Sequence, residues 1–517
     1  MSTATQSSEY AKRWWTLAVL GLSLLIIGLD NTILNVAIPT LQREFDASAS
    51  ELQWMVDAYI LVFAGLLLTM GELSDRFGRK LALQVGLGVF GAASVAAVFA
   101  ETSGQLIAAR AVMGVGGALI MPATLSIITH VFPREERGKA IGIWAAIAGI
   151  GIGLGPLLGG VLIEYFSWSA IFLVNVPIVG IALIAGLRLV PESRDPLARR
   201  IDIPGALLSI GALGALVYAI IEAPSTGWTE PVVLAAFGAV AILSLAFVWW
   251  ERRTPAPMLN LDFFASRSFS VGAGSISVAF FALFGTVFLL TQYLQFVKDY
   301  TALEAGLRIA PIAFGLMLGA GLSDRFIHRF GANRVVAGGL LGLAIALASI
   351  SFWTETTAYW LIAINLIAIS FSMGNIVAPA TDAVMGAVPE AKAGVGSAMN
   401  DVTRQVGGAL GVAIIGSILN SIYSSSIEDS SSTLPAQAAE AARDSIGAAS
   451  IVAETIPDAA GRALDAAAAG AFIEGLGTAV LFAGALALLG AGVVLRFLPN
   501  DDAQLDATAT ADTAEAQ

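Results

Sequence analysis

Three charged residues lie within long apolar stretches of the chain, namely Asp30, Asp57 and Arg110. A charge in hydrocarbon is costly, so such residues are seldom kept for packing alone. A carboxyl in this setting can hold a proton or a cationic ligand, because a neighbouring positive charge changes its proton affinity. Two acids and one guanidinium at a similar depth therefore predict a site at which a proton and a cationic ligand compete.

Each of the three residues also has a plainer interpretation. Asp30 can hydrogen-bond within its own helix and fix a helix contact. Asp57 can reach water at the headgroup level and be inert. Arg110 can be a snorkelling side chain or a fixed ion-pair partner. Proton coupling through all three is the interpretation that we carry forward.

A second group of candidates lies in the later part of the chain. Asp401 and Arg404 are three positions apart, close enough on one helix face to neutralise each other. The alternative is that Asp401 is free and gives a substrate a further acidic contact. The aromatic side chains of Phe281 and Phe284 would supply the generic apolar surface of a binding cavity.

A short charged turn, GELSDRFGRK, separates two apolar stretches at 71–80, and a degraded copy begins at Gly321. The glycine in the middle of the turn permits a tight bend. The charged side chains can pair across neighbouring helix ends and separate when two halves of the protein move. The predicted gating residues here are Gly71, Asp75, Arg76, Gly78 and Arg79. The alternative is a topology signal alone, with Arg and Lys kept on the inner side.

A stripe of small residues, Gly151, Gly155 and Gly159, recurs every four positions and includes Pro156. Glycines at this spacing allow very close helix approach, and the proline adds a local kink. The stripe is either pure packing or a flexible seam that reshapes the outer side of the protein.

The elements that must position these residues are membrane-spanning helices. The 517-residue chain is 57% hydrophobic and only 13% charged, which no soluble domain needs to fill its core. Backbone hydrogen bonding in lipid requires helices. The first run, Trp14 to Ile38, is too long for a signal-peptide core, so we expect it to be retained. Apolar runs of about 20 residues are centred near residues 27, 62, 91, 116, 151, 179, 212, 240, 282, 313, 344, 369, 408 and 484.

The copied turn sets the organisation of the chain. It recurs eight helices later rather than six, which predicts two six-helix bundles separated by two inserted helices. A Ser- and Ala-rich outer segment at 422–470 is expected to lie on the membrane or to shield an exit. The expected parts are a cytoplasmic tail (1–13), a first bundle (14–190), linkers with the inserted helices (191–257), a second bundle (258–498) and an acidic, disordered cytoplasmic tail (499–517).

Positive charge predicts the orientation. Of the 27 Lys and Arg, 20 fall at the two ends or in loops on one side, and four fall on the other side. Short loops rich in positive charge stay in the cytoplasm. We therefore expect a multi-pass protein of a bacterial-type inner (plasma) membrane with both termini in the cytoplasm.

Several function classes are disfavoured. The chain has no cysteine and only two histidines, in separate loops, so neither thiol catalysis nor a metal site is expected. The net charge of −12 comes mostly from the tail, an outer loop and helix ends, and we expect no nucleic-acid partner. No phosphate-binding GxxxxGK[ST] motif is present, which favours a proton gradient over ATP. The expected protein is a monomer without enzymatic activity or cofactor, and its partners are the lipid bilayer, protons and small compounds.

At several points the sequence resembles one known family. The turn GELSDRFGRK resembles the loop signature of the major facilitator superfamily, and LDNTILNVAIP at 29–39 resembles the first-helix signature of its fourteen-helix drug:proton antiporters of the EmrB/QacA type. Arg110, Gly114 and Gly117 look like the fourth-helix motif, and GIGLGPLLGG at 151–160 looks like the fifth-helix motif of exporters. Met113 departs from the usual polar residue, and Ile327 to Arg329 interrupt the second copy of the turn.

The resemblance implies an all-α membrane fold with about fourteen helices, built as two six-helix bundles plus an inserted hairpin. It also implies proton-coupled export of hydrophobic, cationic compounds by alternating access, with substrate contacts at Asp30, Asp57 and Asp401. The alternative is a proton-coupled transporter of a specific metabolite or secreted natural product. A sugar importer would need more polar side chains than the spans offer, which are few beyond Asn31, Asn35, Gln292, Asn365 and Asn375.

Overall fold

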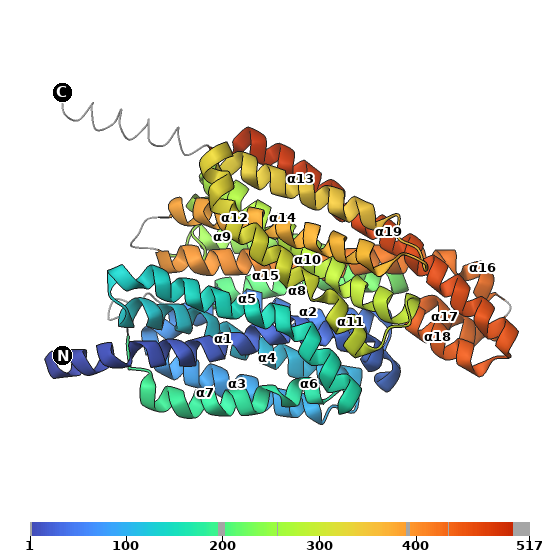
Figure 1. Ribbon diagram of the computed structural model, residues 1–517, viewed down its shortest axis with the longest axis horizontal. Helices are drawn as coiled ribbons and strands as arrows, with labels where there is room; N and C mark the ends of the chain where they lie inside the picture. Colours follow the sequence, from blue (N-terminus) through green and yellow to red (C-terminus); the bar gives the residue numbers. More distant parts are fainter. Residues whose placement is uncertain (1–2, 195–201, 256, 389–392, 433, 500–517) are drawn as a thin grey trace.

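Long helices run side by side through the whole molecule (Figure 1). The computed structural model describes residues 3–194, 202–255, 257–388, 393–432 and 434–499, and all the elements in these ranges are helical. Thirteen helices in the described part are long and apolar enough to cross a membrane. The expected fifth span lies in a further long helix, α5, whose described apolar part is Gly153–Tyr165. The sequence-based expectation of about fourteen spans agrees with this arrangement.

Seven helices make up the first half of the chain. They are α1 (Thr3–Phe45), α2 (Ala49–Phe77), α3 (Arg79–Val98), α4 (Ser103–Val131), α5 (Arg134–Tyr165), the short α6 (Ala170–Leu173) and α7 (Asn175–Leu189). α1 begins within the segment expected as a tail. Ser48 and Glu51 form a capping box that fixes the start of α2, since each side chain bonds a backbone N–H of the other.

The second half repeats this plan with added short elements. It contains η1 (Leu261–Ala265), α10 (Arg267–Gln292), η2 (Tyr293–Val297), α11 (Ala302–Ile309), α12 (Pro311–Phe330), α13 (Ala332–Ile350), α14 (Tyr359–Gly386), α15 (Ala393–Ser426) and α19 (Asp458–Phe497). In the first half α1 packs on α5 and α4 packs on both α2 and α3. In the second half α10 packs on α15, and α14 packs on both α12 and α13. The two halves therefore share one packing scheme.

The copied turn has a glycine with a positive φ in both halves. Gly78 joins α2 to α3 with a φ of 123°, and Gly331 joins α12 to α13 with a φ of 83°. A side chain at either position would be strained, so glycine is required. The two turns support the internal repeat that the sequence predicts.

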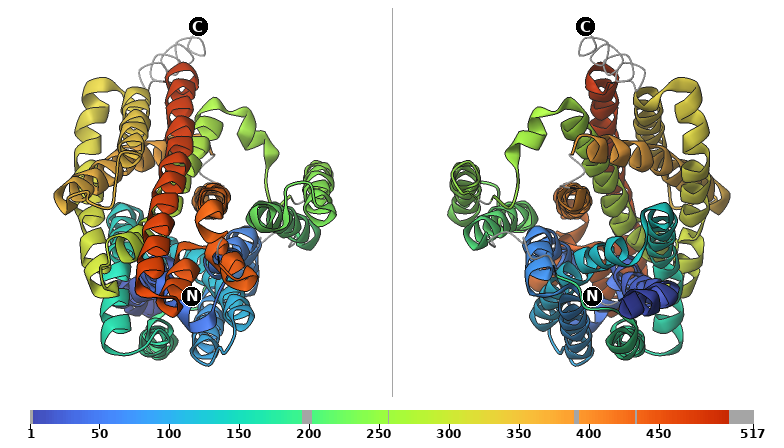
Figure 2. Two further views of the ribbon diagram at one scale, coloured as in Figure 1. Left: turned by 90° about the vertical axis from the view of Figure 1, so that its right-hand side faces the viewer. Right: turned by 90° about the vertical axis from the view of Figure 1, so that its left-hand side faces the viewer.

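An α8–α9 hairpin (Ile203–Thr226 and Pro231–Glu251) lies on one flank of the bundle (Figure 2). α8 packs against α2 from the first half and against α15 from the second. On α9 only Val233 and Glu251 are buried. Apart from the face that packs on α8, this helix is available to lipid.

The outer segment folds onto the helices rather than away from them. Its short helices α16 (Glu428–Ser431), α17 (Ala436–Asp444) and α18 (Ile446–Thr455) gather at the end of the bundle opposite the start of α1 (Figure 1). α18 packs on α19 and α1, and α17 packs on α15. Because the positive charges predict that this end faces outward, we call it the outer end. Residues 500–517, expected to form an acidic tail, lie outside the described residues.

Candidate functional site

The first-half site is a buried ion pair between α1 and α4. Arg110 Nη1 lies 2.5 Å from Asp30 Oδ2, and each side chain is only 1% exposed. Arg110 Nε also donates a hydrogen bond of 3.0 Å to the Met55 carbonyl of α2. The Tyr59 ring lies 4.5 Å from the guanidinium carbon. Three helices thus meet at one neutralised pair of charges.

Close helix packing holds this pair in place. A Cβ at Gly114, one turn after Arg110, would lie 2.6 Å from the Tyr59 carbonyl oxygen of α2. A side chain there would push α4 away from α2 and from the backbone that receives Arg110. The close packing of Gly114 on α2 therefore sets the position of the Arg110 guanidinium. Both residues belong to the fourth-helix motif predicted from the sequence.

The predicted glycine stripe packs on the part of α1 that carries Asp30. Cβ atoms at Gly151, Gly155 and Gly159 would lie 2.9, 3.0 and 2.9 Å from the carbonyl oxygens of Leu25, Leu29 and Ile33. Pro156 lies in the same region, and its carbonyl oxygen contacts Gly306 of α11. The seam therefore touches both the acid-bearing helix and the other half of the protein.

Asp57 lies on a different face of α2 from the ion pair. It is two residues from Tyr59, which corresponds to about 200° around a helix. One turn to either side, Gln53 contacts Gly416 of α15, and Leu61 clusters with side chains of α8 and α15. Asp57 is fully buried, and neither of its carboxyl oxygens has a hydrogen-bond partner among the described residues. The structure therefore brings Asp30 and Arg110 together but places Asp57 apart from them.

Asp401 is buried on α15 in the second half. Its Oδ1 lies 3.9 Å from Arg404 Nη1, at the limit of an ion pair. The Arg404 guanidinium also lies 5.6 Å from the Phe280 ring and donates a long hydrogen bond of 3.5 Å to Thr381. The pairing of Asp401 is loose compared with that of Asp30.

The two predicted phenylalanines lie on α10, in the second half. Phe281 is buried with its ring 6.3 Å from that of Phe482 on α19, and Phe284 stacks edge-on with Phe280 at 5.8 Å. The Phe284 ring also contacts Gly408 of α15. These side chains line the contact between helices of the second half.

The predicted gating turn forms contacts within the first half. Arg79 Nε donates to Asp75 Oδ1 at 2.8 Å, and Arg79 Nη1 reaches the Ser126 carbonyl of α4 at 3.4 Å. Arg76 is exposed and lies over the ring of Phe77. Gly71 faces Pro122 of α4, with 3.5 Å from its Cβ position to the proline Cβ. The turn thus ties α2, α3 and α4 together.

Sequence reasoning missed two features of the site. Tyr59 is a buried aromatic residue among many, and only the position of Arg110 singles it out. A second glycine seam joins α15 to α10, where Gly407 meets the Ser277 backbone and Gly411 meets the Phe281 backbone. The four-residue spacing of these two glycines was the available signal, since it matches the first-half stripe.

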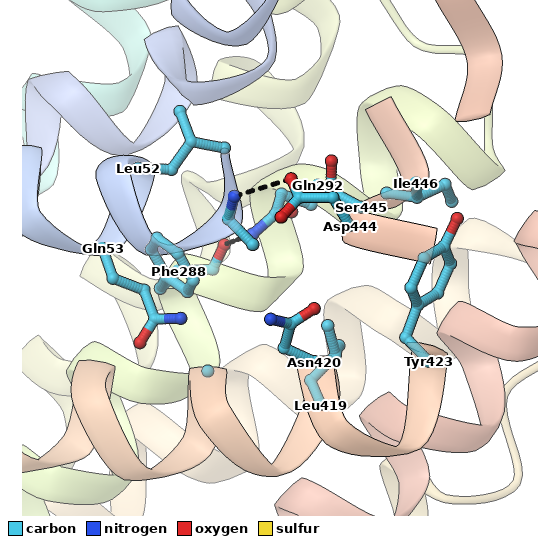
Figure 3. Close-up of a pocket in the computed structure, with 12 residues that line it drawn as sticks. Leu52, Gln53, Phe288, Gln292, Leu419, Asn420, Tyr423, Asp444, Ser445 and Ile446 are labelled. Atoms are coloured by element: carbon cyan, nitrogen blue, oxygen red, sulfur yellow. Dashed lines mark hydrogen bonds between the residues drawn. The ribbon is translucent and has the colours of Figure 1, made fainter. Parts of the chain in front are cut away.

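A small polar cavity lies near the outer end (Figure 3). Its volume of about 20 Å³ suits about one water molecule. Gln53 of α2, Gln292 of α10 and Asn420 of α15 face it, together with Asp444 and Ser445 of the outer segment. The cavity is therefore enclosed by both halves and by the junction of α17 and α18.

The outer segment bonds directly to the first half at this cavity. The Ala49 N–H at the start of α2 donates to Asp444 Oδ2 at 2.9 Å, and the Gln42 amide of α1 donates to Ser445 Oγ. Burial raises the pKa of the Asp444 carboxyl, and the hydrogen bond from Ala49 opposes that shift.

Among the described residues, no group of three or more His, Asp or Glu is placed to hold a metal ion.

Apolar helices in two similar halves, with an ion pair buried in the core, define a multi-pass membrane protein of the transporter class. Its sequence matches that of a known family over most of its length. The chain belongs to the Major Facilitator Superfamily, whose sequence model matches residues 20–412. It is an all-α inner-membrane protein with the fold of that superfamily.

Curated relatives align with nearly the whole chain. The chain is 34% identical to the "Multidrug efflux pump LfrA" of Mycolicibacterium smegmatis, over 96% of its own length and 99% of the relative's. It is 33% identical to the "Methyl viologen resistance protein SmvA" of Salmonella typhimurium, over 92% and 97% of the two chains. It is 30% identical to the "Tetracenomycin C resistance and export protein" of Streptomyces glaucescens, over 93% and 91%.

A solved structure supports the fold independently. A bacterial homologue of the human lysosomal transporter Spinster, in an inward-facing and unoccupied conformation, superposes with a TM-score of 0.65. The alignment covers 94% of this chain and 98% of that chain at 18% identity.

Proposed function

We propose that this protein is a proton-coupled multidrug efflux transporter that exports hydrophobic, cationic compounds by alternating-access antiport. The observation that carries the proposal is the buried Asp30–Arg110 pair, 1% exposed on both sides, in a chain whose relatives are named for drug efflux and resistance. The inserted α8–α9 hairpin supports a transporter of the fourteen-helix type. We propose transport without enzymatic activity.

In this mechanism a cationic substrate and a proton compete for the carboxyl groups. Arg110 neutralises Asp30 when neither is bound. A proton on Asp30 weakens that pair and releases the guanidinium, and a cationic substrate acts on the same acid by charge. Asp57 and Asp401 would supply further acidic contacts, and Phe281 and Phe284 would supply apolar surface. Asp57 suits a proton in particular, because an unpartnered buried carboxylate is costly.

The two halves would rock about the central contact to expose the site to each side in turn. The seam of Gly151, Gly155, Pro156 and Gly159, and the turn with Gly71, Asp75, Arg76, Gly78 and Arg79, are the proposed moving contacts. Both termini would face the cytoplasm, as the positive charges predict. The α16–α18 segment would then shield the outer exit, which is one of the two roles expected for residues 422–470.

The test is drug-driven proton release in everted membrane vesicles. A lipophilic cation such as ethidium is added after the lumen has been acidified, and recovery of lumen pH is followed. We expect release by the parent and by Asp262→Asn, which removes an exposed carboxyl, and none by Asp30→Asn.

A second candidate has a specific observation behind it, since one relative is named for export of the natural product tetracenomycin C. Absence of release across a panel of lipophilic cations would move the assignment to a specific metabolite or secreted natural product. Proton release that is equal in the parent and in Asp30→Asn would instead remove Asp30 from the coupling path.

A further inference from the structure

A crevice opens between α12, α13 and α14, away from the proposed transport site. Its volume of about 490 Å³ falls within the range of about 300–1,000 Å³ typical of ligand sites. Phe326 and Phe330 of α12 and Phe371 of α14 form its aromatic walls. α13 contributes mainly small residues, and no atom lies within 4 Å of a Cβ built at Gly338. The glycines of α13 therefore leave open space on that side of the crevice.

Two polar groups distinguish this crevice from a plain lipid-facing groove. Asn375 is only 4% exposed, and its Oδ1 has no hydrogen-bond partner among the described residues. Its Nδ2 donates to the Phe371 carbonyl at 2.9 Å, so the free atom is an acceptor that lacks a donor. Arg334 lines the same crevice and is exposed. A ligand that pairs with Arg334 must bring a negative charge.

The two polar groups lie at different depths along the crevice. The Asn375 backbone lies 3.5 Å from the Cβ position of Gly339, so the two residues are at one level. Arg334 lies five residues before Gly339, toward the start of α13, which is about 7.5 Å along the helix axis at 1.5 Å per residue. Asn375 therefore lies deeper in the crevice than Arg334, where the other lining residues are aromatic or small.

We propose that the crevice binds an anionic phospholipid of the phosphatidylglycerol type. The phosphate pairs with Arg334 at the end of the crevice next to the copied turn, and an acyl chain runs inward past Asn375 and packs on the aromatic walls. Basic pockets between membrane helices recognise anionic headgroups in this way. The crevice opens at the end of the bundle where the basic residues of the copied turn gather, which the positive-inside rule places at the inner leaflet.

Charge and composition argue against two other occupants. A cationic substrate would meet Arg334 together with Arg325 and Arg329, which are exposed near the end of α12. The acidic residues at 500–517 could satisfy these charges, but that stretch contains one large apolar residue, Leu505, for the aromatic walls. A phospholipid matches both the charge and the apolar surface.

Native mass spectrometry of the purified full chain tests the proposal, with phosphatidylglycerol and zwitterionic phosphatidylcholine titrated in detergent. We expect the parent to prefer phosphatidylglycerol, Arg334→Gln to lower its affinity about fivefold, and Gly338→Leu to abolish the preference by filling the crevice. The matched controls are Gly238→Leu, on α9 of the hairpin at the opposite flank (Figure 2), and Arg253→Gln, two residues after the end of α9, and both should bind like the parent.

Three results would overturn the proposal. Equal phosphatidylglycerol binding by the parent and Gly338→Leu would show that the crevice holds no lipid. Displacement of the bound lipid by ethidium, one for one, would assign the crevice to a substrate. A preference that appears only after residues 500–517 are removed would assign it to the acidic end of the chain.

Discussion

The two buried carboxyls of the first half differ in their partners. Asp30 is held by Arg110, whereas Asp57 has no partner among the described residues. Replacement of one member of a buried ion pair leaves the other charge uncompensated, whereas replacement of an unpartnered carboxyl removes no contact. The two acids therefore predict different stability responses even where both affect transport.

At the first of these sites, Asp30→Asn should lower the free energy of unfolding by about 3–5 kcal/mol, because Arg110 remains buried without a counter-charge. The double variant Asp30→Asn/Arg110→Gln should regain most of that stability but not drug-driven proton release. Thermal unfolding in detergent and vesicle assays measure the two quantities separately.

A surface pair provides the control for this prediction. Glu304→Gln breaks the half-exposed pair with Arg308, at 3.6 Å, and should cost less than about 1 kcal/mol. A double variant as unstable as the single variant would mean that the lost stability comes from packing rather than from the unpaired charge.

At the scale of helices, the sequence predicted where the helices lie in the chain better than which face of each helix points toward its neighbours. Apolar runs located the spans, and the four-residue spacing of Gly151, Gly155 and Gly159 predicted a close helix contact that the structure contains. The face of α2 that carries Asp57 could not be predicted, because α2 is apolar nearly all round and its neighbours decide which side faces α15. The depth of a residue along its helix follows from counting residues. The neighbour that its side chain faces depends on the tertiary contacts of the helix.

The outer segment was also beyond sequence reasoning, which left open whether its short helices lie on the membrane or on the protein. Their composition is compatible with both, since small Ala-rich helices have weakly defined apolar faces. The contacts of Asp444 with Ala49 and of Ser445 with Gln42 decide the question, and they join residues almost 400 positions apart in sequence.

The same contacts predict that the junction of α17 and α18, which we call the lid, opens in a pH-dependent way. In the closed lid burial raises the pKa of the Asp444 carboxyl above its ordinary value of 3.8, whereas an opened lid would hydrate that carboxyl. The closed lid therefore holds the proton more tightly. As pH falls through the window between the two pKa values the closed form should gain stability, and as pH rises the open form should gain.

Labelling of a single thiol measures this opening, because the chain has no cysteine of its own. On acidification, the labelling rate of a cysteine at Asn420, beneath the lid, should fall more than that of a cysteine at the exposed Ser432, after correction for thiol ionisation. Asp444→Asn should remove this difference in pH dependence, and Asp429→Asn, at an exposed carboxyl of α16, should not. An unchanged pH dependence in Asp444→Asn would exclude this carboxyl as the titrating group.

At the scale of the whole molecule, the driving force limits the number of protons. One elementary charge that crosses 100 mV releases about 2.3 kcal/mol, and each tenfold gradient costs about 1.4 kcal/mol. One proton at that potential thus sustains roughly 40-fold accumulation of a neutral solute. For a monocation exchanged against one proton, no net charge moves and the potential contributes nothing. A pump for monocations gains from a second proton acceptor.

Asp57 is the structure's best candidate for that second acceptor, since it is fully buried, has no hydrogen-bond partner among the described residues and is separate from the Asp30 pair. With two protons per monocation the parent should move net charge, so a potassium diffusion potential alone, without a pH gradient, should drive ethidium transport in vesicles. Asp57→Asn should leave one proton, carried by Asp30, exchanged for each monocation. The membrane potential should then no longer drive ethidium transport, whereas a pH gradient should still drive it. Transport by Asp57→Asn that still follows the potential as in the parent would place the second proton elsewhere. Asp401 would then be the next residue to test, because it is buried and only loosely paired with Arg404.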